Sequence, residues 1–233
     1  MSLGQVKTEE KSNEITEIPV LLDMLEIKGC IITIDAMGCQ TDIAEKINEK
    51  QADYVLAVKD NQTFLHEAIT DYFEVAIAAN NPDTISYSSI QKSMQIMDET
   101  RRCHLSTCLN TLPDASRWKG LKSIGMVESE RTVNGKTSID CRHYICTLKD
   151  VNPFAHAARA HWGVENSLHW VLDVTFREDE SRIRKGYAPE NFNIFRQLGI
   201  NMLKKEPSKM IIKKKRFEAA LNDKFRENVV FLG

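Results

Sequence analysis

Apolar positions in the N-terminal third of the chain follow two spacings. They recur every three or four residues at 13–25, 41–49 and 63–79, which predicts three helices. They form short continuous runs at 30–34 and 54–58, which predicts two strands buried on both faces. Because the strands alternate with helices, this part of the chain is expected to form a parallel sheet with helical crossovers.

The pattern changes after the breaker Asn80-Asn81-Pro82-Asp83. Four strand-like stretches follow, at 85–90, 97–108, 123–133 and 138–148. Asn134-Gly135 between the last two is typical of a tight hairpin turn. We therefore expect an antiparallel β insertion at 83–148.

Helical spacing returns at 152–173, 189–204 and about 213–225. The chain thus divides into a first α/β part at 4–80, the β insertion at 83–148, and a helical part at 152–233.

The composition is that of an ordinary globular protein, with 42% hydrophobic and 27% charged residues. The sequence shows neither an apolar stretch long enough for a membrane span nor a signal-peptide pattern, which favours a cytoplasmic protein with six reduced cysteines. The net charge is −2, but residues 177–233 hold 14 Lys or Arg against 8 Asp or Glu. A basic end on an acidic body suggests contact with a polyanion, and a solvated helix face explains the same charges.

Two acidic residues occupy positions that suggest chemistry. Asp35 follows the apolar run 30–34, and ligands of parallel sheets bind outside the carboxyl ends of strands. A turn or a helix cap explains Asp35 equally well. Glu165 interrupts an apolar helical stripe made of Phe154, Ala158, His161, Glu165, Leu168 and Leu172. A carboxylate there is costly unless it binds a metal or pairs, for example with His161 or His169 one turn away.

Four motifs together resemble the H-repeat-associated insertion-sequence transposases of the DDE type. They lie at 34–40, 58–62, 161–166 and 168–174, and they read IDAMGCQ, VKDNQ, HWGVEN and LHWVLDV. The resemblance extends from about Gly4 to the C-terminus.

The resemblance implies an RNase H-like core whose Asp-Asp-Glu triad holds two divalent ions, Mg²⁺ or Mn²⁺. Asp35 would be the second Asp and Glu165 the Glu, both as catalytic metal ligands. The implied activity is metal-dependent DNA strand cleavage and strand transfer in transposition. The partners would be transposon ends and target DNA in the bacterial nucleoid, and a second copy of the chain, in a homodimer, is a further candidate partner.

The sequence departs from the family pattern in its first residues. The family's first Asp lies on the first strand of the core, whereas Leu3 to Val6 resembles the tail of the third strand. We therefore expect an incomplete core that lacks its first strands and first Asp, and a chain that does not cleave DNA alone.

Several polar residues are candidates for DNA contacts. Related transposases often carry Tyr, Arg and Lys around the Glu, at offsets where this chain has Ala158, His161 and Leu172. His161 would replace the Arg as a phosphate contact. Further candidates are His169, Arg177, Arg182, Arg184 and Lys185 in the helical part, and Lys59, Asn61 and Gln62 after the second strand. The alternative for the last three is an ordinary polar loop that caps a helix.

Other interpretations stay open. A zinc site made of Cys103, His104, Cys108, Cys141, His143 and Cys146 has no known finger spacing. His161, Glu165 and His169 would make another metal site on one helix face. The run 213–216, Lys-Lys-Lys-Arg, would bind DNA backbone or begin a solvated helix. At the level of function, the rivals are a non-catalytic DNA-binding remnant, an unrelated metal-dependent nuclease, and an interaction module built on the β insertion.

Overall fold

A computed structural model of the chain describes residues 6, 14–92, 97–133, 135–164 and 168–231. The chain forms two compact units. We call Thr8–His161 the sheet unit, and Met1–Lys7 together with Trp162–Gly233 the helical unit.

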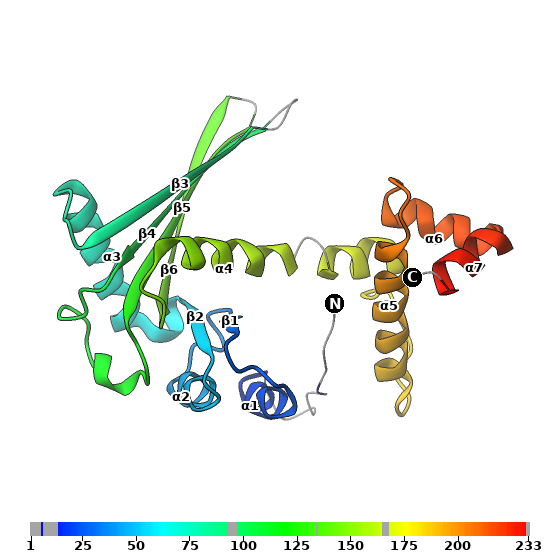
Figure 1. Cartoon of the computed structure of the whole chain (residues 1–233), viewed down its shortest axis with the longest axis horizontal. Helices are drawn as coiled ribbons and strands as arrows, with labels where there is room; N and C mark the ends of the chain where they lie inside the picture. Colours follow the sequence, from blue (N-terminus) through cyan, green and yellow to red (C-terminus); the bar gives the residue numbers. More distant parts are fainter. Residues whose placement is uncertain (1–5, 7–13, 93–96, 134, 165–167, 232–233) are drawn as a thin grey trace. The chain divides into compact units, whose positions relative to one another are not determined.

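One mixed sheet organises the sheet unit (Figure 1). Its six strands run in the order β1 (Ile31–Ile34), β2 (Asp53–Val58), β6 (Lys136–Cys146), β5 (Ser123–Val133), β4 (Met97–Ser106) and β3 (Thr84–Lys92). β1 and β2 are parallel, and every later neighbour pairs antiparallel. The antiparallel strands expected at 83–148 are confirmed, and they continue the same sheet beyond β2.

The β5–β6 hairpin follows the turn signal in the sequence. Val133 pairs with Lys136, so the turn lies between these two residues. Gly135 has a φ of 75°, a value that glycine adopts without steric cost. Asn134 lies outside the described residues.

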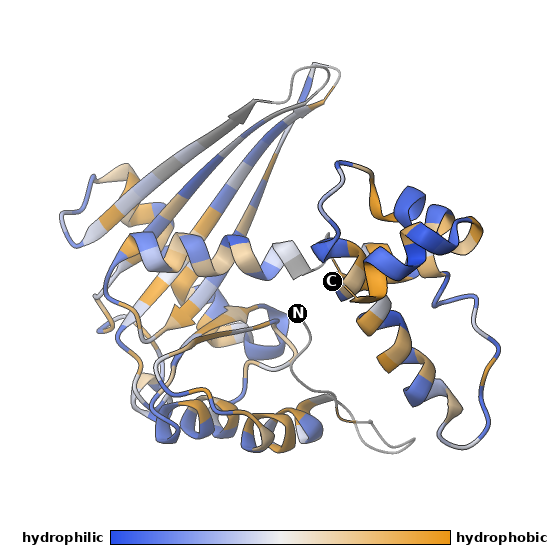
Figure 2. Ribbon diagram, turned by 45° about the vertical axis from the view of Figure 1, so that its right-hand side comes forward, coloured by the Kyte–Doolittle hydropathy of each residue, from blue (hydrophilic) through white to orange (hydrophobic). Residues whose placement is uncertain are grey.

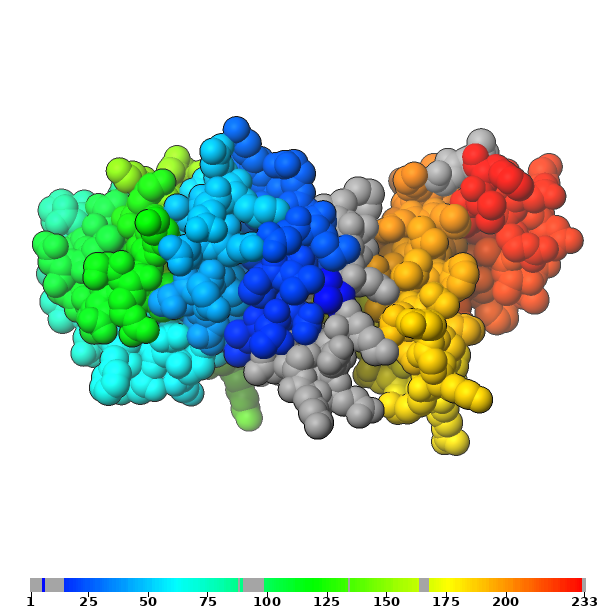
Figure 3. Space-filling model, turned by 90° about the horizontal axis from the view of Figure 1, so that it is seen from below, coloured from blue at the N-terminus to red at the C-terminus, as the bar shows by residue number. Residues whose placement is uncertain are grey.

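Three helices cover one face of this sheet: α1 (Glu14–Met24), α2 (Thr41–Glu49) and α3 (Thr63–Ala78). Ile43 and Ile47 of α2 and Phe73 of α3 are fully buried in the core that these helices form with the sheet. Figure 3 shows α1 and α2, in blue, next to each other on this side of the unit.

The opposite face is covered by α4 (Val151–Val164). Phe154 and Ala158 of this helix pack against Val127 and Tyr144 of the sheet. Gly125 makes room for them, because a Cβ there would lie 2.4 Å from Cζ of Phe154. In Figure 2 the apolar strand segments gather where helices cover the sheet, and the strands become more polar toward their free ends.

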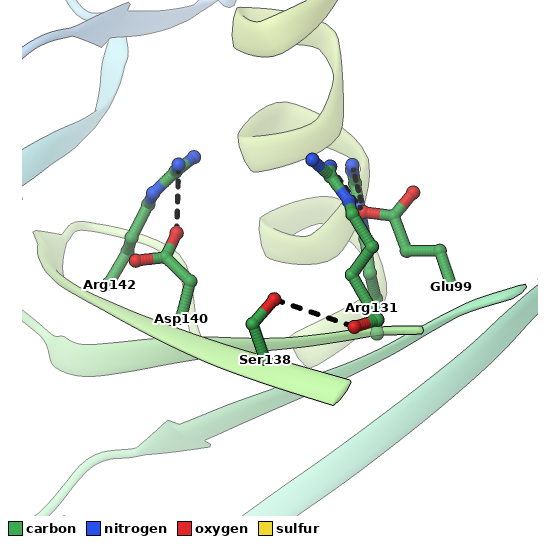
Figure 4. Close-up of polar contacts among 6 residues, drawn as sticks. Glu99, Arg131, Ser138, Asp140 and Arg142 are labelled. Carbon is green, nitrogen blue, oxygen red and sulfur yellow. Dashed lines mark hydrogen bonds and ion pairs between the residues drawn. The ribbon is translucent and has the colours of Figure 1, made fainter. Parts of the chain in front are cut away.

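Ion pairs lie on β4, β5 and β6 near the β5–β6 turn, beyond the part of these strands that α4 covers and on the same face of the sheet (Figure 4). The buried Glu99 carboxylate accepts hydrogen bonds from Arg101 at 2.9 Å and Arg131 at 3.2 Å. Burial alone would raise the pKa of Glu99, but these two guanidinium groups lower it overall. Arg142 pairs with Asp140 at 2.8 Å. The pairs satisfy charged side chains that lie on the strands beyond the part packed against α4.

The helical unit contains a π-helical turn, η4 (Val171–Thr175), and the helices α5 (Ala188–Lys205), α6 (Ile212–Leu221) and α7 (Asp223–Phe231). Val171, Leu172 and Ile200 form its small core. Lys215 of α6 is buried and donates to the carbonyl oxygens of Leu203 and Glu206, at the end of α5. The Lys-Lys-Lys-Arg run at 213–216 therefore includes one lysine that closes a helix end instead of facing solvent.

Three local expectations are corrected. β1 is an edge strand of the described sheet, so Ile31 is 38% exposed and the strand is not buried on both faces. The helix expected at 213–225 is two helices, because Asn222 ends α6 and its side chain accepts a hydrogen bond from the backbone of Phe225. The apolar stripe expected on one helix at 152–173 does not pack in a single core. Phe154 packs against the sheet, whereas Leu172 belongs to the core of the helical unit.

Candidate functional site

Asp35 lies at the carboxyl end of β1, where the chain turns toward α2. Its side chain is exposed, and its Oδ1 atom accepts a long hydrogen bond of 3.4 Å from the Gly38 amide. The turn is closed by two backbone bonds, from Cys39 N to Ala36 O at 3.1 Å and from Gln40 N to Gly38 O at 3.0 Å. Most of the hydrogen-bonding capacity of the Asp35 carboxylate therefore remains for a ligand.

Gly38 fixes the base of this turn. An added Cβ would lie 2.3 Å from Cγ2 of Ile34 and 2.9 Å from Cδ1 of Ile18. The close approach of β1 and α1 thus requires glycine at this position, and it holds the Asp35 turn against both elements.

The segment after β2 lies beside this turn. It forms a short 3₁₀ helix, η1 (Asp60–Gln62), in which the Asn61 Nδ2 atom donates to Ala36 O at 2.6 Å. The Gln62 Nε2 atom donates to Cys39 O at 3.0 Å. Lys59, just before η1, is exposed. Asn61 and Gln62 were predicted as DNA contacts, and in the structure their amide groups bind the backbone of the Asp35 turn.

The end of α4 reaches the same strand from the other side. The His161 Nδ1 atom lies 3.2 Å from Oγ1 of Thr33. Thr33 precedes Asp35 by two positions, and residues two apart on a strand point to the same face. Glu165, four positions after His161 in the sequence, lies outside the described residues.

The pairing of two histidines near the carboxyl end of β2 was missed by the sequence reasoning, which named His143 only as a zinc candidate. His66 Nε2 of α3 lies 3.1 Å from Nδ1 of His143, which sits opposite Val58 on β6. His66 also faces the Asp60 carboxylate at 3.6 Å. Burial, together with the neighbouring His66, lowers the pKa of His143 to about 4. The two histidines are far apart in the sequence, and only the pairing of β2 with β6 brings them together.

The other expected DNA contacts belong to the helical unit. His169, Arg182, Arg184 and Lys185 are exposed there. Arg177 adopts a φ of 55° and forms an exposed ion pair with Glu180 at 3.6 Å. Asp35, Lys59, Asn61, Gln62 and His161 are the candidates that the sheet unit brings to one edge.

The zinc alternative finds no support in the described part of the chain, where no group of three or more His, Cys, Asp or Glu side chains is arranged to hold a metal ion. Cys103 and Cys146 are buried, and burial raises the pKa of both thiols. The alternative site on the helix depends on Glu165, which lies outside the described residues. Among those residues, no helix is long and apolar enough to cross a membrane.

Comparison with known proteins decides the family. The family model described as "Transposase DDE domain" matches residues 1–202. The chain belongs to this transposase DDE family. Its H-repeat resemblance is confirmed by relatives in Escherichia coli, and no solved structure matches the chain.

Two relatives align with almost the whole chain. "Putative transposase YncI" of E. coli O157:H7 is 45% identical over 98% of this chain and 60% of its own length. "H repeat-associated putative transposase YhhI" of E. coli K12 is 42% identical over 97% of this chain and 58% of its own length. The chain therefore spans about three fifths of the length of these relatives.

Proposed function

We propose that this chain is part of the catalytic domain of a transposase that cleaves DNA strands and joins them to target DNA with the help of divalent cations. Asp35 and Glu165 supply carboxylate ligands for those cations. The proposal rests on the family and on one contact in the sheet unit, the hydrogen bond between His161 and Thr33.

That contact links the two segments that carry the carboxylates. Thr33 lies two positions before Asp35, and His161 lies four positions before Glu165. His161 and Thr33 both belong to the sheet unit, and each comes a few positions before one of the two carboxylates in the sequence.

The donor chemistry fits a hard cation. Asp35 offers an exposed carboxylate, and Mg²⁺ and Mn²⁺ prefer such oxygen ligands. Two bound cations would stabilise the attacking and leaving oxygens of an in-line phosphodiester displacement. The chain's own contribution is to supply carboxylate ligands and to bind DNA phosphates.

Basic residues of both units are candidates for the phosphate-binding role. Lys59 is exposed directly after β2, at the same edge as Asp35. His169, Arg177, Arg182, Arg184 and Lys185 are the exposed candidates of the helical unit. His161 is the remaining candidate, and its ring already contacts Thr33.

An RNase H-like core is the fold that we propose for the complete catalytic domain. The parallel pair β1–β2, with α2 between the two strands and an acidic residue at the carboxyl end of β1, supports this proposal. The edge of β1 that does not face β2 is where further strands of such a core would pair.

Mn²⁺ binding tests the proposal. Mn²⁺ affinity is measured by calorimetric titration of the wild-type chain and of two variants, Asp35→Asn and Glu165→Gln. Either substitution should lower the Mn²⁺ affinity at least about tenfold, which corresponds to about 1.4 kcal/mol. Asp42→Asn, an exposed acid in the first turn of α2, is the matched control and should bind as the wild type does.

Other outcomes would contradict the proposal. Tight Mn²⁺ binding that neither substitution changes would favour an unrelated metal-dependent nuclease. Absence of Mn²⁺ binding, with salt-dependent DNA affinity retained, would favour a non-catalytic DNA-binding protein.

A further inference from the structure

Asn61 and Gln62 stand out because their side chains bind the backbone of a much earlier part of the chain. Asn61 donates to Ala36 O at 2.6 Å, and Gln62 donates to Cys39 O at 3.0 Å. These carbonyl groups belong to the turn that begins at Asp35. We propose that Asn61 and Gln62 are positioning residues that hold the Asp35 carboxylate in place for its cation, an inference that rests on the proposed function.

The two tethers act on both ends of one turn. Ala36 O already accepts the Cys39 amide at 3.1 Å, so the Asn61 side chain satisfies its second lone pair. Cys39 O follows three positions later, at the start of the path into α2. With both carbonyls held, the turn has little freedom to rotate Asp35 away from the sheet edge.

The other restraints that the described residues place on the turn are its backbone hydrogen bonds, the packing of Gly38 and a 3.3 Å bond from the Gln40 side chain to Met37 O. The Asp35 carboxylate itself accepts a 3.4 Å contact from the Gly38 amide, and Gln40 precedes α2 without a side-chain cap. By contrast, η1 is anchored at both ends, since it connects the buried strand β2 to α3. Asn61 and Gln62 therefore transmit the rigidity of β2 and α3 to an exposed turn.

This role differs from direct DNA contact by Asn61 or Gln62. An amide group that holds a backbone carbonyl has a fixed orientation, and it keeps at most one N–H for a phosphate or a base. The structure thus assigns these residues to the orientation of Asp35, and Lys59 remains the exposed basic residue of the loop.

Cys39 provides a local probe of the turn. Its side chain is fully buried, and burial raises the pKa of its thiol to about 12, so it reacts with alkylating reagents only when the turn opens. Cys146 is fully buried in the sheet and reacts only on larger opening, so it is an internal control. Labelling rates of both residues, resolved by peptide mass spectrometry, separate local from global change.

Asn61→Ala and Gln62→Ala should each raise the labelling rate of Cys39 about three- to tenfold, which is the effect of losing one hydrogen bond. The rate at Cys146 should stay within about twofold, because the sheet keeps its own hydrogen bonds. Asn61→Asp keeps the shape but removes the donor, and it should act as Asn61→Ala does. Asn110→Asp and Asn110→Ala, at an exposed turn elsewhere in the sheet unit, are the matched controls and should change neither rate.

Mn²⁺ titration of the same variants supplies the second readout. Asn61→Ala should weaken Mn²⁺ binding several-fold while DNA affinity stays at the wild-type value. An unchanged Cys39 rate in Asn61→Ala and Gln62→Ala overturns the inference, as does a loss of DNA affinity without a change in Cys39 labelling. A faster Cys39 rate in a chain whose wild type binds no Mn²⁺ would support the tether and refute the proposed function.

Discussion

The contact between Gly125 and Phe154 determines how closely α4 approaches the sheet. A Cβ at position 125 would lie 2.4, 2.6 and 3.0 Å from Cζ, Cε2 and Cε1 of Phe154, whose ring is fully buried. Alanine is intrinsically better than glycine within a strand by about 0.5–1 kcal/mol. Overpacking of this kind costs about 1–3 kcal/mol. We therefore expect Gly125→Ala to lower the free energy of unfolding of the sheet unit by about 1–2 kcal/mol.

A double-mutant cycle with Phe154→Leu tests the cause. Leucine at position 154 leaves room for a methyl group, so Gly125→Ala in that background should be neutral or slightly stabilising. Cys146 is buried under α4, so its rate of labelling at increasing urea concentrations measures the unfolding of the sheet unit. A stabilising effect of Gly125→Ala in the wild-type background, or an equal loss in both backgrounds, would refute the packing argument.

Four further changes have defined outcomes. The pKa of His143 falls from 6.5 to about 4 on folding, so the free energy of unfolding should rise by about 3 kcal/mol between pH 4 and 6.5. Urea unfolding of His143→Gln at the same pH values should show a smaller rise. Lys215→Met should destabilise the helical unit by about 2 kcal/mol, whereas the exposed Lys214→Met should change its urea midpoint little. Gly38→Ala should speed Cys39 labelling at least about threefold, since it crowds Ile34. Finally, the chain with Mg²⁺ should not measurably nick supercoiled DNA, because a two-ion site needs more ligands than two carboxylates; robust nicking would contradict this.

Local patterns in the sequence predicted most of the strands and helices. The strand-like stretch before the Asn134-Gly135 signal predicted β5 at 123–133, and the structure has the same bounds. The exposure of β1 was not predictable in this way, because its apolar run resembles that of the central strand β2 and only the strand order distinguishes them.

The break between α6 and α7 had a readable signal. Asn222 is a favoured residue at the start of a helix, and its side chain accepts the backbone N–H of Phe225 at 3.1 Å. Helical spacing alone concealed it, since apolar positions continue on both sides. A search for caps inside long periodic segments would have found the boundary.

The candidate site was predictable in part. The position of Asp35 after a short apolar strand suggested a ligand site before any geometry was known, and the structure confirms the strand. The roles of Asn61 and Gln62 were not predictable, because their partners are distant in the sequence and are reached only through the parallel pairing of β1 with β2. The contact of His161 with Thr33 joins segments that are further apart still, and it depends on how α4 packs across the sheet.

The central claim is that Asp35 and Glu165 bind the same cations. The most direct test is a ¹⁵N NMR titration of the chain with Mn²⁺, whose paramagnetism broadens signals of nearby amides. We expect the amide signals of Asp35 and Glu165 to disappear together at the lowest Mn²⁺ concentrations, and Asp35→Asn to protect both signals. Broadening of only one of the two amides, or of neither, would contradict it.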